Sequence, residues 1–497
     1  MERLYKLTES DNVAVATMEL VKGDVEKDGE NTITILSEIP QGFKVALVDI
    51  HEGEDVIKYG IPIGHATKDI QKGELVHTFN MTTNLSDKED AGDFPFKTQN
   101  IENDHDIPLI NAYLRRDGKI GIRNSIWILP LSQNLNVLSK ELEAWGSREL
   151  GIEDKVHAFL HAHAQSQFGE DEKFILMLTN MITHPDHGGV LLAALEVDRD
   201  VISQILGKIP DYLGERVRVL YADSIADEFE EGKKLLRELA ECMKGDKRTS
   251  VSISKLVIGL KCGQSDALSS ITANRLIGKA ADYFSAQGSS LILTEVPEML
   301  GSSKNLVMRA KDDSVREKVI ELTKRYRKFL DREGKKKGEA SPLLKLEGIS
   351  TEEEESMGAV QKAGQSMITD VLEFGEVVKM PGISLLASSG TDAETSTALT
   401  ISGVNMILFS TGIGTPYGAP VPTIKIASNR ELSEKKPNWI DFDSSRITRE
   451  DPDEVLADLI RLIVSVSNGE KRTRNEENGN MEIAYNMHAN PGKTDQE

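Results

Sequence analysis

Side chains that could do chemistry gather at residues 261–266, which read Lys-Cys-Gly-Gln-Ser-Asp. A lysine amine can act as a general base, and a cysteine thiolate is both a nucleophile and a metal ligand. The aspartate adds a carboxylate that could face a metal ion. Lys261, Cys262 and Asp266 are therefore the first candidates for a functional site. Capping of the helix that follows is the alternative use of the small polar residues here.

A strand–helix–strand unit is expected to position these residues. Residues 256–260 predict a buried strand, and apolar side chains recur at helical spacing from 271 to 284. Gly288 is typical of a helix end, and residues 290–294 predict a second strand. The right-handed crossover makes the two strands parallel neighbours. Ligands of open parallel sheets bind beyond the carboxyl ends of the strands, where 261–266 and 295–298 should meet.

Three stretches of this region resemble the altronate dehydratase family, whose relatives include galactarate dehydratase and sulfolactate sulfo-lyase. They are Lys-Cys-Gly-Gln-Ser-Asp at 261–266, Ser-Ser-Ile-Thr-Ala-Asn at 269–274 and Leu-Thr-Glu-Val-Pro-Glu-Met at 293–299. The resemblance extends through nearly the whole chain. It implies a hydro-lyase that removes water from a sugar acid such as altronate and gives a 2-keto-3-deoxy acid. It also implies a divalent metal cofactor, iron(II).

The resemblance suggests roles for particular residues. In such a reaction a base removes the proton α to the carboxylate, and a metal helps the β-hydroxyl to leave. Lys261 or His77 would be the base, and Cys262, with Asp266 and His77 as further candidates, would face the metal. His77 opens the segment His-Thr-Phe-Asn, where the family usually has His-x-His-Asn, so Phe79 replaces a second imidazole. Taken by itself, His77 is typical of a hydrogen-bonded loop histidine.

A basic motif at residues 113–124 is unusual in so acidic a chain. It matches the family signature Tyr-x-Arg-x-Asp-Gly-x-x-Gly-x-Arg-Asn at each fixed position. Arginine can hold a carboxylate through two parallel hydrogen bonds, so Arg115, Arg123 and Asn124 are candidates for binding the sugar acid. The alternative is that both arginines pair with acidic neighbours across a domain interface.

A glycine-rich loop at residues 411–418 is a second candidate for anion binding. Its backbone N–H groups could cradle a carboxylate, which makes Thr411, Gly412 and Gly414 candidate substrate-binding residues. The family usually has arginine where Ile413 stands.

Several positions where the family carries metal-ligand side chains are changed in this chain. Five cysteine positions and one histidine position are replaced, and soft thiolates are the ligands that iron sites use. We therefore expect no iron–sulfur cluster. The alternative function is a non-catalytic or altered-specificity paralogue that has lost the cysteine ligands. The six positions are Phe79, Asn134, Gln165, Val197, Ala359 and Ala363.

The pattern of strands, helices and polar stretches predicts an α/β protein with two α/β domains and mainly parallel sheets, preceded by a small all-β domain. The first domain resembles the SAF-like (β-clip) module of the family. A polar linker is also expected at 244–252, and the tail is expected to be mobile. The predicted ranges are 1–85 for the SAF-like domain, 86–108 for a linker, 109–250 and 251–470 for the α/β domains, and 471–497 for a polar tail.

Composition limits the class of protein. The chain has 497 residues, a net charge of −22 and two cysteines, Cys242 and Cys262. The negative charge argues against nucleic acid and anionic membranes as partners, and two cysteines exclude a disulfide framework. No apolar run is long enough for a membrane span. We expect a cytoplasmic protein with a small anionic sugar-acid substrate, which could assemble as a homo-oligomer.

Overall fold

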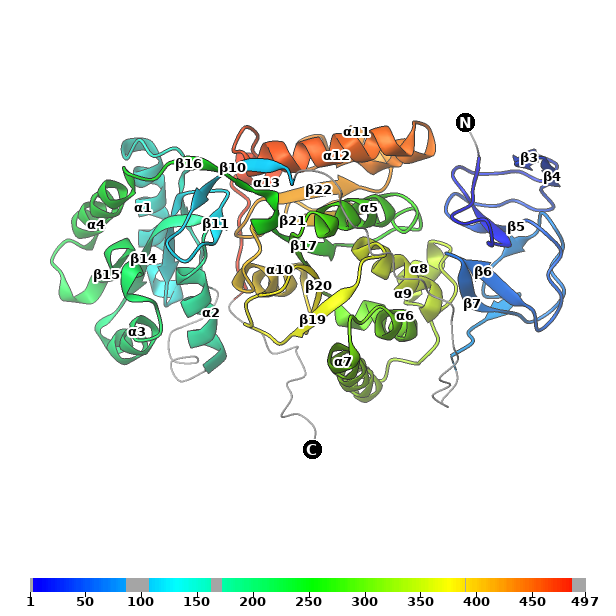
Figure 1. Ribbon diagram of the computed structural model, residues 1–497, viewed down its shortest axis with the longest axis horizontal. Coiled ribbons are helices and arrows are strands. Elements are labelled where there is room, and N and C mark those ends of the chain that lie inside the picture. Colours follow the sequence, from blue (N-terminus) through cyan, green and yellow to red (C-terminus); the bar gives the residue numbers. More distant parts are fainter. Residues whose placement is uncertain (1–2, 86–106, 162–171, 389, 485–497) are drawn as a thin grey trace.

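Three units follow one another along the long axis of the computed structural model (Figure 1). The C-terminal unit lies between the other two. The predicted fold class is confirmed, because a small all-β unit precedes two α/β units with mainly parallel sheets. None of the described helices combines the length and the apolar character of a membrane span. The structure describes residues 3–85, 107–161, 172–388 and 390–484, so residues 86–106 of the predicted linker lie outside it.

The N-terminal unit consists of short strands that pair antiparallel around two small apolar cores. Glycine turns connect the strands. Gly73 has a φ of +86°, and a Cβ there would lie 1.9 Å from the Thr34 carbonyl oxygen, so glycine is required. The strands are β1 (Leu4–Tyr5), β2 (Val13–Ala16), β3 (Val25–Asp28), β4 (Asn31–Thr34), β5 (Lys44–Ala46), β6 (Asp55–Lys58), β7 (Ile61–Ala66), β8 (Leu75–Val76) and β9 (Met81–Thr82).

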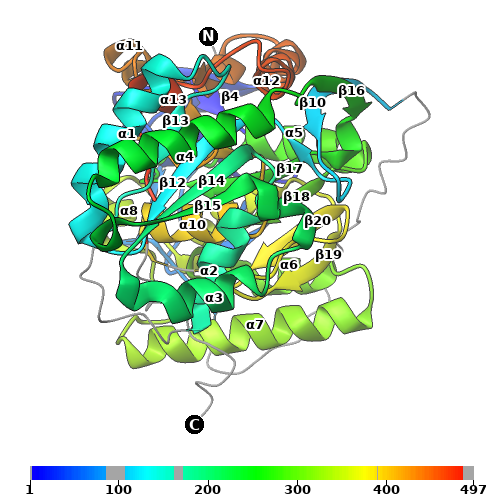
Figure 2. The ribbon, with the colours of Figure 1, turned by 90° about the vertical axis from the view of Figure 1, so that its left-hand side faces the viewer.

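The unit at the opposite end is built on a four-stranded parallel sheet, seen from its outer side in Figure 2. The strand order is β13 (Val156–Ala158), β12 (Ser125–Pro130), β14 (His187–Ala194), β15 (Val217–Tyr221). Successive side chains point to opposite faces of a strand. Ile126 and Ile128 therefore pack with α1 (Asn136–Glu149) and α4 (Glu228–Met243), while Trp127 and Leu129 pack with α2 (Glu172–Ile182) and α3 (Arg199–Leu206).

A seven-stranded parallel sheet forms the centre of the C-terminal unit. Its order is β19 (Ile368–Leu372), β20 (Gly382–Leu386), β18 (Ser290–Leu293), β17 (Val257–Cys262), β21 (Met406–Thr411), β22 (Thr423–Ala427), β23 (Phe442–Asp443). The predicted strand–helix–strand unit is confirmed as β17, α5 (Ala273–Ala286) and the parallel strand β18.

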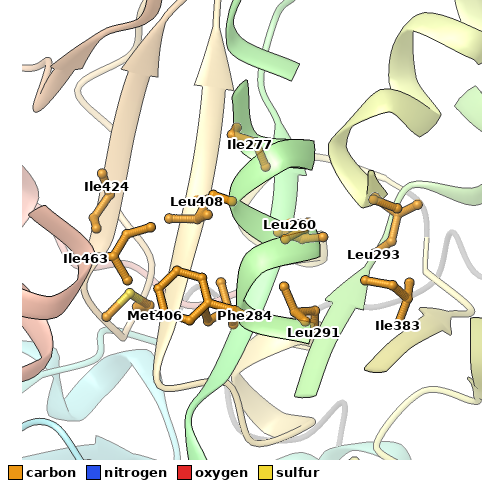
Figure 3. Close-up of a cluster of buried hydrophobic side chains, with 14 of the residues drawn as sticks. Leu260, Ile277, Phe284, Leu291, Leu293, Ile383, Met406, Leu408, Ile424 and Ile463 are labelled. Atoms are coloured by element: carbon orange, nitrogen blue, oxygen red, sulfur yellow. The ribbon is translucent and has the colours of Figure 1, made fainter. Parts of the chain in front are cut away.

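Helices cover both faces of this sheet. Leu260, Phe284 and Ile463 meet in the core beneath α5 and α12 (Pro452–Ser467) (Figure 3). On the other face α10 (Asp392–Ile401) packs against Ile407 and Phe409. The remaining helices are α6 (Ser303–Met308), α7 (Asp313–Arg332), α8 (Pro342–Leu346), α9 (Glu352–Val360), α11 (Arg430–Lys435) and α13 (Arg474–Asn478).

Two stretches predicted to lack structure are ordered. Within the expected 244–252 linker, β16 (Arg248–Ser252) pairs antiparallel with β10 (Leu109–Leu114), which also pairs with β11 (Ile120–Gly121). Residues 471–484 of the expected mobile tail contain α13, where the buried Glu476 pairs with Arg123. The polar composition of both stretches marked them as loops, but Val251 packs in the core with Ile110, and Glu476 is buried against Arg123.

A buried carboxylate joins the N-terminal unit to the C-terminal one. Glu354 on α9 accepts hydrogen bonds from Lys58 Nζ to Oε1 and from Lys44 Nζ to Oε2, both at 2.8 Å. All three side chains are buried. Burial alone would raise the pKa of Glu354, but the two ammonium groups outweigh it and lower the pKa to about 2.

Replacing Glu354 by glutamine should lower the free energy of unfolding by about 3–5 kcal/mol, because both buried ammonium groups would lose their carboxylate. Calorimetry would compare Glu354→Gln with Glu317→Gln, an exposed position on α7 that should leave the melting temperature unchanged. Since the folded pKa is depressed, this stabilisation is present above the ordinary glutamate pKa and is lost as the pH falls toward 2. Equal melting temperatures of Glu354→Gln and the parent would contradict the assignment.

Candidate functional site

The candidate site lies where parallel strands of the C-terminal sheet end. Cys262 is the last residue of β17, Glu295 comes two residues after β18, and Asp392 begins α10 after β20. These strands are neighbours and run in the same direction, so their carboxyl ends share one edge. The predicted meeting of residues 261–266 with residues 295–298 is confirmed by the contacts described next.

The Lys261 ammonium is buried at this edge and has three acceptors. Nζ donates to Glu295 Oε1 at 2.6 Å, to Asp392 Oδ1 at 2.8 Å and to the Cys262 carbonyl oxygen at 2.8 Å. Burial alone would lower the pKa of Lys261, but the two carboxylates outweigh it and raise the pKa. A protonated ammonium cannot accept a proton, which argues against the predicted role of Lys261 as the base.

The Cys262 thiol is buried among charged groups from two other segments. Sγ donates to Glu298 Oε2 at 2.9 Å and to Glu295 Oε2 at 3.3 Å. Lys362, in the turn after α9, places Nζ 2.6 Å from Sγ. The ligand atoms of Cys262, Glu295 and Glu298 all lie within 4.8 Å of one another, so they form a group that could hold a metal ion.

Mutual burial sets the protonation of this group. Burial, together with the charges of Glu295 and Glu298, raises the pKa of the Cys262 thiol well above its ordinary value. Burial would also raise the pKa of Glu295, but Lys261 and Lys362 lower it. Partial burial and the charge of Glu295 raise the pKa of Glu298 to about 7. The two carboxylates of the group thus differ in pKa, and Glu295 is the more acidic one.

The donor set suits a divalent metal in chemical type, because a thiolate with two carboxylates can ligate iron(II), manganese(II) or zinc(II). The Lys362 ammonium lies among the same donors. Its Nζ is 3.5 Å from Glu295 Oε2 and 3.8 Å from Glu298 Oε2, in addition to its contact with Sγ. A metal ion and this ammonium would therefore compete for one position.

The backbone at Glu295 is strained. Its φ of 71° and ψ of 52° lie in the left-handed region, which costs a non-glycine residue about 1–3 kcal/mol. The carboxylate is fixed by Lys261 and by the Cys262 N–H, which donates to Oε2 at 3.0 Å. These buried contacts hold the strained turn in place. Such strain is concentrated at functional sites.

A cleft of about 310 Å³ opens beside this group, and Glu298 is the member that reaches it. The Glu298 side chain is 39% exposed, whereas Lys362 is 1% exposed and lies behind it. The wall of the cleft is rich in hydroxyl, amide and carboxyl groups, which suits a polyhydroxy ligand. Its other polar members include Gln264, Ser265, Asp266, Ser269, Ser270, Asn274, Glu354 and Glu355.

Asp266 lines the cleft but is already well supplied with hydrogen-bond donors. Its Oδ1 accepts from Ser428 Oγ at 2.7 Å and its Oδ2 accepts from Asn429 Nδ2 at 2.8 Å. The structure brings the glycine-rich loop against it, since a Cβ on Gly412 would lie 2.5 Å from the Asp266 carboxyl carbon. These hydrogen bonds tie the segment that carries Asp266 to Ser428 and Asn429.

The other two candidates of the glycine-rich loop bond within it. The Gly414 N–H donates to Thr411 Oγ1 at 2.8 Å. The residues that line the cleft do not include Thr411, Gly412 or Gly414. The structure thus brings this loop beside Asp266 without exposing its N–H groups to the cleft.

His77 reaches the C-terminal unit but not the Cys262 group. Its Nδ1 lies 3.0 Å from Ser350 Oγ, and its ring packs edge-on to Phe43 at 5.2 Å between centres. Burial and the nearby Lys44 charge lower its pKa. The predicted pairing of His77 with Cys262 as metal ligands is not seen, because His77 binds the segment next to Glu354 instead.

The arginines of the basic motif at residues 113–124 bond to other parts of the protein. Arg123 donates to Glu476 through Nε at 2.6 Å and Nη2 at 2.9 Å. Arg115 donates to Asn124 Oδ1 at 2.9 Å and to the Pro185 carbonyl oxygen at 2.8 Å. This geometry matches the interface alternative for Arg123, and none of the three predicted residues lines the cleft at Glu298.

Sequence reasoning did not assign Glu298, Asp392 or Lys362 to the site. Glu298 lies in a motif already placed at the sheet edge, and Asp392 follows a predicted strand, so the strand-end rule could have found both. Lys362 lies 100 residues from Cys262 in a short turn, Gln361–Ala363. No periodicity marks it, although it lies between the family ligand positions Ala359 and Ala363.

The replaced ligand positions are spread over the structure, but Ala359 lines the cleft at Glu298 and Ala363 follows Lys362 in the turn beside Cys262. Asn134 follows β12 and Val197 follows β14, and both are exposed at the carboxyl edge of the four-stranded sheet. Ala359 and Ala363 are buried in the C-terminal unit, and Phe79 is exposed on the N-terminal one. Gln165 lies outside the described residues. The Cys262 group thus keeps a thiol and two carboxylates, while two changed cysteine positions beside it are alanine.

Comparison with known proteins covers all three units. Residues 2–84 match the altronate/galactarate dehydratase SAF domain, and residues 112–244 match the D-galactarate dehydratase/altronate hydrolase second domain. Residues 253–490 match the D-galactarate/altronate dehydratase C-terminal domain.

Full-length relatives agree with these matches. The chain is 38% identical to altronate dehydratase of Bacillus subtilis (strain 168) over 491 residues, covering 97% of this chain and 98% of the relative. It is 38% identical to altronate dehydratase of Escherichia coli (strain K12), covering 96% and 98%. Galactarate dehydratase (L-threo-forming) of the same organism is 27% identical, covering 95% and 94%. The chain belongs to the altronate/galactarate dehydratase family.

Proposed function

We propose that the protein is a hydro-lyase that removes water from a sugar acid, altronate in the first place, to give a 2-keto-3-deoxy acid. The observation that carries the proposal is the position of Glu298, which lines the polar cleft and also contacts Cys262 and lies near Lys362. A carboxylate with this double contact can meet a substrate on one side while buried charges fix it on the other. The altronate dehydratases to which the chain is similar support the substrate class.

In the proposed reaction Glu298 takes the proton from the carbon next to the substrate carboxylate. The C–O bond at the adjoining carbon breaks, and the hydroxyl leaves as water after it receives that proton. The enol that remains rearranges to the 2-keto-3-deoxy acid. The buried ammonium groups of Lys261 and Lys362 keep Glu295 ionised.

We propose a divalent metal as cofactor, iron(II) on the basis of the family resemblance. Cys262 and Glu295 would hold it, while Glu298, the third member of the group, serves as the base, and the metal would supply Lewis-acid assistance to the departure of the hydroxyl. Lys261 then serves to position Glu295, and Asp266 to position the loop at the cleft. No described residue favours the non-catalytic alternative. The homo-oligomer and the cytoplasmic location stay predictions.

Replacing Glu298 by glutamine should reduce turnover of altronate by about 10²–10⁴-fold, because an amide cannot accept the proton. The rate of 2-keto acid formation would be measured with saturating divalent metal. Glu321→Gln, at an exposed position on α7, serves as the control and should keep the parent rate. A fully active Glu298→Gln protein would contradict this assignment.

Replacing Lys362 by glutamine should tighten manganese(II) binding by roughly tenfold or more, because a competing positive charge is removed from among the donors. Titration calorimetry with Mn²⁺ alone measures this without any turnover. Lys335→Gln changes an exposed lysine on the wall of the cleft and should bind Mn²⁺ like the parent. Weaker or equal affinity in Lys362→Gln would show that the ammonium does not occupy the metal position.

Anaerobically purified protein should contain no labile sulfide. A cluster takes four protein ligands, and the chain has two cysteines, of which Cys242 lies on α4 in another unit. Iron and sulfide assays with visible absorption check this. Stoichiometric iron with sulfide would contradict it.

A further inference from the structure

A second cavity lies between the N-terminal unit and the C-terminal one. Its volume is about 510 Å³. Residues 59–61 of the N-terminal unit form one wall, and side chains from α5, α6 and the turn after α9 form the other. The N-terminal unit lies beside α8 and α9 in Figure 1. The residues that line this cavity differ from those that line the cleft at Glu298.

Arg309 is a buried cation on the wall of this cavity. It is 1% exposed, and it donates to the carbonyl oxygens of Ser366 at 2.7 Å and Ala363 at 2.8 Å through Nη2. None of its hydrogen bonds within the described residues uses Nη1. The carboxylate that acts on its charge is Asp282, which accepts from the backbone and hydroxyl of Ser366 instead. Nη1 of this lining residue thus has no hydrogen-bond partner among the described residues.

Arg275 on α5 lines the same cavity. Its Nη1 donates to Tyr5 Oη at 3.0 Å. Within the part of the chain that the structure describes, neither Arg275 nor Arg309 forms an ion pair with a carboxylate. Arg309 is buried and Arg275 is half-buried, and a charge withdrawn from water without a counter-ion is costly, so the two arginines in one cavity favour the binding of an anion.

The wall of the cavity also carries neutral donors and no acid. Gln361 and Gln365 contribute side-chain amides, and no aspartate or glutamate is among the described lining residues. This is unusual for a chain with a net charge of −22. The cleft at Glu298, by contrast, is lined by four carboxyl groups. The cavity between the units is therefore the more basic of the two.

We propose that this cavity is a second binding site, which takes a small oxyanion bearing a carboxylate or phosphate group between Arg275 and Arg309. Planar guanidinium groups match the geometry of both anions. The anion would contact the C-terminal unit directly and neutralise charge at the junction with the N-terminal unit. It would therefore stabilise the protein as its concentration rises, since it binds the folded state.

Titration calorimetry with the full chain would use inorganic phosphate and succinate as separate probes, without sugar acid. We expect saturable binding of at least one probe and a loss of about tenfold or more in Arg275→Gln, which removes a charge-assisted contact. Arg148→Gln is the matched control, because Arg148 is an exposed arginine on α1 that also forms no ion pair with a described carboxylate. Glu298→Gln should bind the probes like the parent, which separates this site from the cleft.

A second variant tests the site without removing a structural contact. Gln365 is exposed at the rim, and Gln365→Glu would place a negative charge beside the anion, so probe affinity should fall while the melting temperature without probe stays unchanged. Binding of phosphate alone would identify a phosphoryl ligand, and binding of succinate alone a carboxylate. Saturation by neither probe, or equal losses in Arg275→Gln and Arg148→Gln, would overturn the proposal whatever the outcome for altronate turnover.

Discussion

A buried ammonium group persists only where carboxylates surround it, and the edge of the C-terminal sheet is built on this constraint. Lys261 and Lys362 are almost completely buried, and Glu295 contacts both of them. The parallel sheet makes this possible, because strand ends that are far apart in sequence meet at one edge. The strained backbone at Glu295 and the raised pKa of Glu298 both follow from the need to pack these charges together.

A buried carboxylate held by two ammonium groups also joins the N-terminal unit to the C-terminal one. Glu354 pairs with Lys44 and Lys58 of the N-terminal unit and also lines the cleft that Glu298 reaches. One helix, α9, thus contributes to the domain junction and to the wall of the site. A change that separates the N-terminal unit would leave a buried carboxylate unpaired beside the cleft, so assembly of the units and formation of the site depend on each other.

Two of the changed cysteine positions lie away from the Cys262 group. Asn134 and Val197 stand at the carboxyl edge of the four-stranded sheet, whereas the Cys262 group stands at the corresponding edge of the seven-stranded one. Loss of thiolates at the first edge leaves the second intact. Phe79 lies in the N-terminal unit, Ala359 and Ala363 lie beside the Cys262 group, and Gln165 lies outside the described residues. The carboxylates and lysines at Cys262 are present despite these changes.

The sequence alone determined the strand–helix–strand unit around α5 and the meeting of residues 261–266 with 295–298, because apolar periodicity records which face of an element is buried. The tertiary structure decided which charges meet. Lys362 reaches Cys262 across 100 residues, and Glu476 pairs with Arg123 across 353. Such pairings depend on strand order and on the packing of whole units, which no local pattern encodes.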